Sequence, residues 1–150
     1  MKGAISKGKL AWSSIGSFSS ASPQFGCSTL FWSLIEEGKM KGIRRPSLDY
    51  QILYFSFILD LREHLFKRVS HLSGGTLQKA RLIGVLLGFP ELVLIDDPTQ
   101  HLDQLAGRDL MMCLRYLSGS LRFGLLFSAK RCSEVEFGCE KYLALGKRGE

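Results

Sequence analysis

The chain has 150 residues, of which 45% are hydrophobic and 23% are charged, a composition that suits one packed core and excludes a disordered chain. Its formal net charge of +6 is compatible with phosphate-rich ligands or anionic membranes, although a solvated surface with excess lysine is the simpler explanation. No window approaches the roughly 18 consecutive apolar residues of a membrane span, and no secretory signal is visible. The four cysteines show no C-x-x-C spacing, which argues against a zinc site and suits a reducing compartment.

The first half of the chain gives weak signals of secondary structure. Residues 4–10 alternate in polarity and predict one or two weak strands. The serine-rich stretch 12–23 is expected to be a loose loop. Residues 48–68 carry apolar side chains at helical spacing and predict a helix.

The second half alternates regularly between strand and helix patterns. Ser73 predicts the N-cap of a helix that ends at Gly88. The apolar run over residues 91–95, ELVLI, is typical of a strand buried on both faces in a parallel sheet. This alternation predicts an α/β fold. The remaining predicted elements are a helix at 103–117, a strand at 121–127, a helix at 133–138 and a strand at 142–145.

The segment Leu72-Ser73-Gly74-Gly75 is the first motif with chemical content. Two glycines directly after a serine cap leave backbone N–H groups uncovered at the start of a helix. Because these amides and the helix dipole both point at the same place, such a helix end attracts an anion. A bare Ser-Gly-Gly is common, however, and by itself it is a weak signal, for which a turn is the alternative.

About twenty residues later, Asp96 and Asp97 follow the apolar strand directly. Ligands of open α/β sheets lie at the carboxyl ends of the strands. One carboxylate there can hold Mg²⁺ through its water shell, and the next can orient an attacking water. An acidic strand-to-loop turn without a ligand remains the alternative for this segment considered alone.

Together, these motifs resemble the ATP-binding cassette of ABC transporters. Residues 72–75 (LSGG) are similar to the family signature, residues 92–97 (LVLIDD) to its Walker B strand, and residues 100–103 (QHLD) to its D-loop. Their order and spacing agree with the family, and the resemblance covers roughly residues 3–147. It implies a partial P-loop NTPase-like α/β cassette, with a helical signature subdomain and a parallel-sheet C-terminal part.

The resemblance also implies ATP and Mg²⁺ as cofactors and assigns roles to single residues. Asp96 is expected to hold Mg²⁺ through water. Gln24, in the segment Ser-Pro-Gln-Phe, looks like the Q-loop glutamine that contacts both metal and nucleotide. The other implied nucleotide-binding residues are Ser73, Gly74, Gly75 and Asp103.

Three regions of the chain follow from the same resemblance. They are a Q-loop region (residues 1–30), a helical signature subdomain (residues 31–89), and a part with Walker B, D-loop and C-terminal α/β elements (residues 90–150). The Pro-Gln-Phe sequence around Gln24 leans toward the A subfamily, whose members are largely lipid transporters.

The chain departs from the family at its phosphate-binding loop. The Walker A pattern, G-x-x-x-x-G-K-[ST], has one near-match at residues 3–10, where Leu10 replaces the hydroxyl residue that ligates Mg²⁺. Gln24 follows this near-match too closely for the helix and strands that separate the two motifs. Residues 3–10 align better with a later strand pair of the family, so the chain is expected to begin inside the cassette.

Two catalytic positions are also degenerate. Asp97 stands at the general-base position, where the family usually has glutamate. Its carboxylate is one methylene shorter, and a misplacement of that size can cost about 10²-fold in rate. Lys130 stands at the position of the switch histidine, and lysine is a flexible point charge without an imidazole's orienting ability.

The resemblance implies a subunit that couples ATP binding and hydrolysis to transmembrane transport, lipid being the cargo class toward which the subfamily points. The implied partners are a second cassette, whose ATP the LSGG segment would contact, and transmembrane domains, at the cytoplasmic face of a membrane. Hydrolysis at the chain's own site is not expected, so its status as an enzyme is open.

Two other functions remain open. A non-catalytic remnant or regulatory fragment is favoured by Asp97 and Lys130 and opposed by the intact LSGG segment and Walker B strand. A soluble relative that acts on nucleic acid is suggested only by the net charge, and nucleic acid is not expected as a partner.

Overall fold

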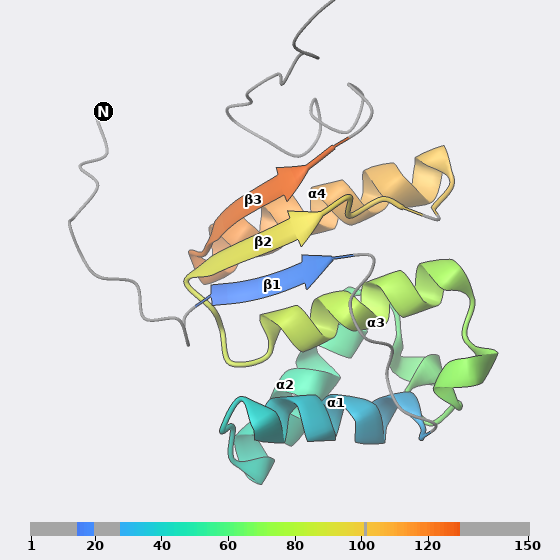
Figure 1. The fold of residues 1–150 in the computed structure, drawn as a ribbon, viewed down its shortest axis with the longest axis vertical. Coiled ribbons are helices and arrows are strands. Elements are labelled where there is room, and N and C mark those ends of the chain that lie inside the picture. Colours follow the sequence, from blue (N-terminus) through green and yellow to red (C-terminus); the bar gives the residue numbers. More distant parts are fainter. Residues whose placement is uncertain (1–14, 20–27, 101, 130–150) are drawn as a thin grey trace, which may run out of the picture.

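The computed structural model describes residues 15–19, 28–100 and 102–129. These residues contain a parallel three-stranded sheet, against which the helices pack (Figure 1). The strands lie side by side in chain order and are β1 (Ile15–Ser19), β2 (Leu92–Asp96) and β3 (Gly124–Ser128). The register pairs the last residue of β2, Asp96, with the last residue of each neighbour. The carboxyl ends of all three strands therefore meet at one edge.

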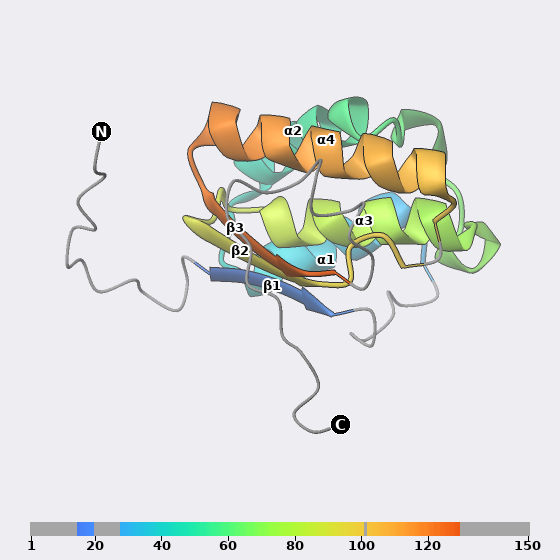
Figure 2. The same ribbon diagram turned by 90° about the horizontal axis from the view of Figure 1, so that it is seen from above.

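Within the part of the chain that the structure describes, four α-helices accompany this sheet: α1 (Leu30–Met40), α2 (Arg45–Ile58), α3 (Gly74–Leu86) and α4 (Gln104–Leu121). Two short 3₁₀ helices, η2 (Arg62–His64) and η3 (Val69–His71), join α2 to α3. Seen from above, α3 and α4 lie on the same side of the sheet (Figure 2). α1 and α2 pack against α3 and form a helical layer beyond it.

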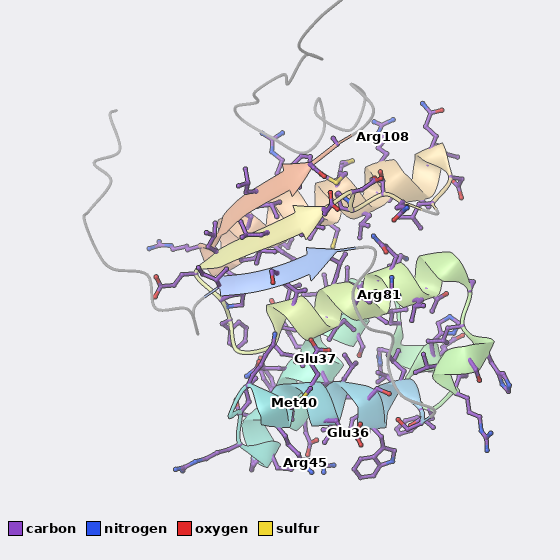
Figure 3. The ribbon with its side chains drawn as sticks, viewed as in Figure 1. Glu36, Glu37, Met40, Arg45, Arg81 and Arg108 are labelled. Carbon is purple, nitrogen blue, oxygen red and sulfur yellow. The ribbon has the colours of Figure 1, made fainter. Side chains whose placement is uncertain are left out.

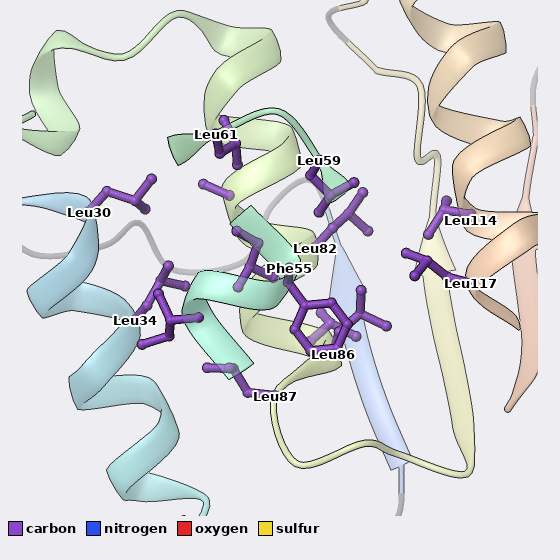
Figure 4. Close-up of a cluster of buried hydrophobic side chains, with 14 of the residues drawn as sticks. Leu30, Leu34, Phe55, Leu59, Leu61, Leu82, Leu86, Leu87, Leu114 and Leu117 are labelled. Atoms are coloured by element: carbon purple, nitrogen blue, oxygen red, sulfur yellow. The ribbon is translucent and has the colours of Figure 1, made fainter. Parts of the chain in front are cut away.

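Side chains from all four helices form one buried core together with the sheet (Figure 4). Phe55 of α2 is fully buried among leucines of α3, while Leu114 and Leu117 of α4 cover the β2 strand from the same side. Val93 and Ile95 are the β2 residues buried in this core. The helical layer and the sheet are thus stabilised by one continuous apolar contact.

Two glycines allow close approach between these layers. A Cβ atom on Gly16 of β1 would lie 2.8 Å from the backbone oxygen of Val85 in α3, so any side chain there would push α3 away from the sheet. Gly84 of α3 faces the carboxylate of Glu37, which lies between α1 and α3 (Figure 3). A side chain on Gly84 would occupy the space of that carboxylate.

The second half of the chain confirms the predicted order of elements. α3 begins after Ser73 and ends just before Gly88, whose φ of +91° turns the chain. β2 and β3 occupy the predicted positions within three residues, and α4 is four residues longer than expected at its C-terminal end. The predicted elements at 133–138 and 142–145 lie outside the described residues.

For the first half, one expectation is wrong, one is right only in part, and one helix was missed. The serine-rich stretch contains β1, because pairing with β2 orders a segment of low local preference for any structure. The helix expected at 48–68 is α2 at Arg45–Ile58, and Asp60, with a φ of +55°, ends it. α1 was not anticipated from the sequence. The strands expected at 4–10 lie outside the described residues.

The expectation that β2 is buried on both faces is also wrong. Val93 and Ile95 are buried, but Leu92 and Leu94 are only half-buried and face the opposite side of the sheet. The physical reason is that α3 and α4 cover the same side of the sheet (Figure 2). None of the helices in residues 28–100 and 102–129 combines the length and the hydropathy that a membrane span requires.

Candidate nucleotide-binding site

The N-terminus of α3 lies at least partly at the surface. Ser73 is the N-cap, and its hydroxyl oxygen accepts a hydrogen bond of 3.2 Å from the Thr76 amide. The amides of Gly74 and Gly75 stand in the first turn, where a helix supplies no backbone acceptor. Ser73 and Gly74 are exposed, and α3 has no acidic residue in its first turn. This helix end can therefore receive an anion.

Gly75 has a second role that the sequence did not indicate. A Cβ atom at this position would lie 2.8 Å from Cδ2 of Leu102, in the loop between β2 and α4. The glycine thus lets the start of α3 lie directly against that loop. Any larger residue would have to displace the Leu102 side chain.

The carboxyl edge of the sheet carries the two predicted carboxylates. Asp96 is exposed at the end of β2, and its Oδ1 accepts a hydrogen bond from the Ser128 hydroxyl at the end of β3. The same hydroxyl oxygen accepts a hydrogen bond of 3.0 Å from the Asp97 amide. Ser128 therefore orients both acidic residues at once.

Asp97 has an unusual backbone conformation. Its φ is +50°, in the left-handed region that residues other than glycine rarely adopt, and only 7% of the residue is exposed. The buried Gln78 side chain, from α3, donates hydrogen bonds to the carbonyl oxygens of Asp97 (3.4 Å) and Pro98 (2.9 Å). The turn after β2 is thus fixed from α3 on one side and from β3 on the other.

Asp103 caps α4. Its Oδ1 accepts hydrogen bonds of 3.0 Å from both the Leu105 and the Ala106 amides. A carboxylate in this position satisfies two amides and opposes the positive end of the helix dipole. The structure therefore assigns Asp103 a role at the start of α4 in addition to the predicted contact with nucleotide.

The opposite end of α3 is held by α1. The Lys41 ammonium group donates hydrogen bonds to the carbonyl oxygens of Gly84, Val85 (3.4 Å) and Leu87 (3.5 Å), at the negative end of α3. Loss of solvent raises the pKa of Glu37, and the Lys41 charge partly opposes this rise. Loss of solvent likewise lowers the pKa of Lys41, against the effect of Glu37.

The described residues contain no group of three or more His, Cys, Asp or Glu side chains that could enclose a metal ion. A cation at Asp96 would accordingly complete its coordination with water and ligand phosphates, as Mg²⁺ characteristically does. The exposed carboxylate of Asp96, with Ser128 fixing one of its oxygens, fits this mode of binding.

Some of these residues were predicted from the sequence, and others were not. The predicted residues Ser73, Gly74 and Gly75 lie at the start of α3, and Asp96 and Asp97 at the end of β2. Gln24 and Lys130 lie outside the described residues. The contacts of Gln78, Leu102 and Ser128 were missed, and the one available signal was a polar Gln78 within the apolar pattern of α3.

Comparison with known proteins relates the chain to ATP-binding proteins. No protein-family model matches it. The chain is 33% identical over 84 residues to a putative HMP/thiamine import ATP-binding protein of Bacillus subtilis. The aligned region covers 56% of the chain and 15% of that protein. It is 34% identical over 98 residues to a putative ABC transporter ATP-binding protein of Bacillus thuringiensis, which covers 64% of the chain and 18% of that protein.

A further relative is a cholesterol transporter of Homo sapiens, 26% identical over 104 residues, which covers 69% of the chain and 6% of the transporter. The chain thus spans less than a fifth of the length of each of these relatives. Its fold matches the solved structure of cbiO1 from Clostridium perfringens, part of the ABC transporter complex cbiONQ, with a TM-score of 0.72 at 18% identity. That match covers 82% of the chain and 49% of cbiO1.

Proposed function

We propose that the chain is an ATP-binding cassette of the ABC transporter kind, on the strength of its similarity to these relatives, and that it contacts ATP held by a second cassette. In this proposal Ser73 and the amides of Gly74 and Gly75 bind the terminal phosphate of that ATP. The observation that carries the proposal is the start of α3, where two glycines follow a neutral cap and both Ser73 and Gly74 are exposed.

The residues after β2 supply the second part of the proposal. Asp96 would hold Mg²⁺ through water, the metal neutralising phosphate charge when it is bound. Asp97 stands at the general-base position, where a carboxylate orients water. Gln24 and Lys130 complete this proposed set as the Q-loop residue and the residue at the switch-histidine position, and Asp103 contributes from the D-loop.

The proposed setting is a transporter complex at the cytoplasmic face of a membrane. The partners are a second cassette and transmembrane domains, in line with the description of cbiO1 as part of a transporter complex. Lipid is the cargo class we propose, supported by the Pro-Gln-Phe sequence at residues 23–25 and by the similarity to a human cholesterol transporter. The three regions 1–30, 31–89 and 90–150 remain the proposed division of the chain.

Titration with a fluorescent, non-hydrolysable ATP analogue tests the contact with nucleotide. The analogue is added to a cassette that carries a Walker A loop, with and without this chain. Since hydrogen bonds to a charged group are worth about 1.5–3 kcal/mol, we expect the chain to tighten analogue binding about 10-fold or more. Binding that is unchanged by the chain contradicts the proposal and supports a fragment without a nucleotide role.

A charge introduced at the start of α3 provides a sharp variant. Gly74→Asp places a carboxylate where the phosphate would lie, yet a carboxylate at a helix N-terminus does not destabilise the helix. We therefore expect a folded protein that no longer tightens analogue binding. Gly119→Asp, at a position of α4 where a Cβ has open space, is the matched control with the same charge change and is expected to behave as wild type.

A further inference from the structure

The backbone of Asp97 is held in a rare conformation by two elements that are distant in the sequence. Its amide is bound by the Ser128 hydroxyl from β3, and its carbonyl by the Gln78 side chain from α3. A residue with a left-handed backbone persists only where its surroundings enforce it, and such residues cluster at functional sites. The backbone that carries the Asp97 carboxylate is therefore held by both contacts.

Gln78 is an unusual residue for its position. It is 1% exposed, on the face of α3 that packs into the molecule, where an apolar side chain would serve packing better. A buried amide costs free energy unless it forms hydrogen bonds. The Nε2 atom of Gln78 donates two hydrogen bonds, and both acceptors are carbonyl oxygens in the turn after β2. Its chemistry thus serves the position of Asp97 and Pro98 rather than the packing of α3.

The first turn of α3, which precedes Gln78, contacts the loop before α4. Gly75 lies against Leu102, and Gln78 comes one helical turn later. The first two turns of α3 therefore contact the segment 97–102 at both of its ends. A displacement of the start of α3 would therefore change the contacts that hold the backbone of Asp97.

We propose that Gln78 is a positioning residue that couples the start of α3 to the Asp97 peptide. A change at Ser73, Gly74 or Gly75 shifts the first turns of α3, and Gln78 transfers that shift to the turn that carries the Asp97 carboxylate. The coupling rests on the proposed function only for the identity of the ligand, ATP held by a second cassette. The coupling itself runs through contacts within this chain and requires no ligand or partner.

Amide hydrogen exchange, followed residue by residue by NMR on the full chain, tests this coupling without any ligand. Two amides report on the turn: that of Asp97, bound to Ser128, and that of Gln100, bound to the Asp97 carbonyl. We expect Gln78→Leu to accelerate exchange at both by about 10-fold, the effect of losing hydrogen bonds of ordinary strength. Gln78→Met, which keeps the unbranched shape, is made in parallel in case the leucine variant does not fold.

Gln51→Leu is the matched control. Gln51 is also buried, at 3% exposure, and its Oε1 accepts a hydrogen bond of 2.7 Å from the Gly88 amide at the other end of α3. This variant is expected to accelerate exchange at Gly88 and to leave Asp97 and Gln100 unchanged. Acceleration of Asp97 and Gln100 by Gln51→Leu to the same degree would mean general destabilisation and would overturn the proposal.

The transfer itself is tested by removing the cap of α3. Ser73→Ala is expected to accelerate exchange at Asp97 and Gln100 about 3-fold when Gln78 is present, since loss of a cap weakens the first turn. In the Ser73→Ala, Gln78→Leu double variant, the cap change should add nothing at these two amides. Equal effects of Ser73→Ala with and without Gln78 would contradict the coupling, whatever the outcome of the ATP-analogue titration.

Discussion

The two helices that follow the chain's recognisable motifs begin in different ways. α3 begins with a neutral serine cap that takes one amide, and two glycines follow it. α4 begins with Asp103, whose carboxylate takes two amides and carries a negative charge. The positive end of α4 is thus compensated by a charged cap within the chain, while α3 has a neutral cap and no acidic residue in its first turn. The two caps, Ser73 and Asp103, therefore differ in their charge and in the number of amides that they satisfy.

We expect α4 to be fixed mainly by its buried face. Leu114 is fully buried, and replacement by alanine should lower the free energy of unfolding by about 2–5 kcal/mol, through lost transfer energy and the cavity left behind. Urea denaturation measures this change. Met112→Ala, at a half-exposed position of the same helix, should cost under about 1 kcal/mol, and equal losses for the two variants would show that α4 is not anchored by this face.

Removal of the α4 cap is expected to have the next largest effect. Asp103→Ala leaves the Leu105 and Ala106 amides without their acceptor and should lower the free energy of unfolding by about 1–2 kcal/mol. Asp109→Ala, at an exposed position of α4, makes the same charge change without removing a cap. The assignment of Asp103 as a structural cap is wrong if both variants denature at the same urea concentration.

Removal of the α3 cap should cost less. Ser73→Ala frees only the Thr76 amide, at an exposed helix end, and should lower the free energy of unfolding by about 0.5–1 kcal/mol. Ser120→Ala, at an exposed position of α4, is the control and should change it by less than about 0.5 kcal/mol. A loss for Ser73→Ala larger than that for Asp103→Ala would reverse the comparison between the two helix starts.

The opposite end of α3 gives a prediction about pH, and its effect is expected to be the smallest. Burial raises the pKa of Glu37 above its usual value of 4.5, so the folded chain binds this proton more tightly than the unfolded chain does. Stability contributed by Glu37 is therefore present below pH 4.5 and is lost as the pH rises through the raised pKa. Glu37→Gln should remove this dependence, so the difference in unfolding free energy between wild type and variant should change over that pH range. A constant difference would contradict the raised pKa.

The residues that could be predicted from the sequence are those whose role is local. The Ser73 cap depends on its own first turn, and Asp96 and Asp97 follow an apolar run whose length defines β2. The fold class follows from the alternation of such runs. These features require no knowledge of which segments meet in space.

The contacts that were missed depend on packing between distant segments. β1 is a strand because it pairs with β2, more than 70 residues further along the chain. Ser128 reaches Asp96 because the parallel register sets the two residues side by side. Gln78 reaches Pro98 only because α3 packs beside the end of β2. No local pattern contains this information, so these contacts required the structure.

The left-handed backbone of Asp97 also restricts which residue types can occupy its position. Aspartate and asparagine tolerate a positive φ better than residues with longer side chains do, because their short polar groups can bond to the nearby backbone. A glutamate would extend the carboxylate by one methylene but would fit this backbone less well. At this position, the reach of the carboxylate and the conformation of the chain therefore favour different residues, and the aspartate found here suits the backbone.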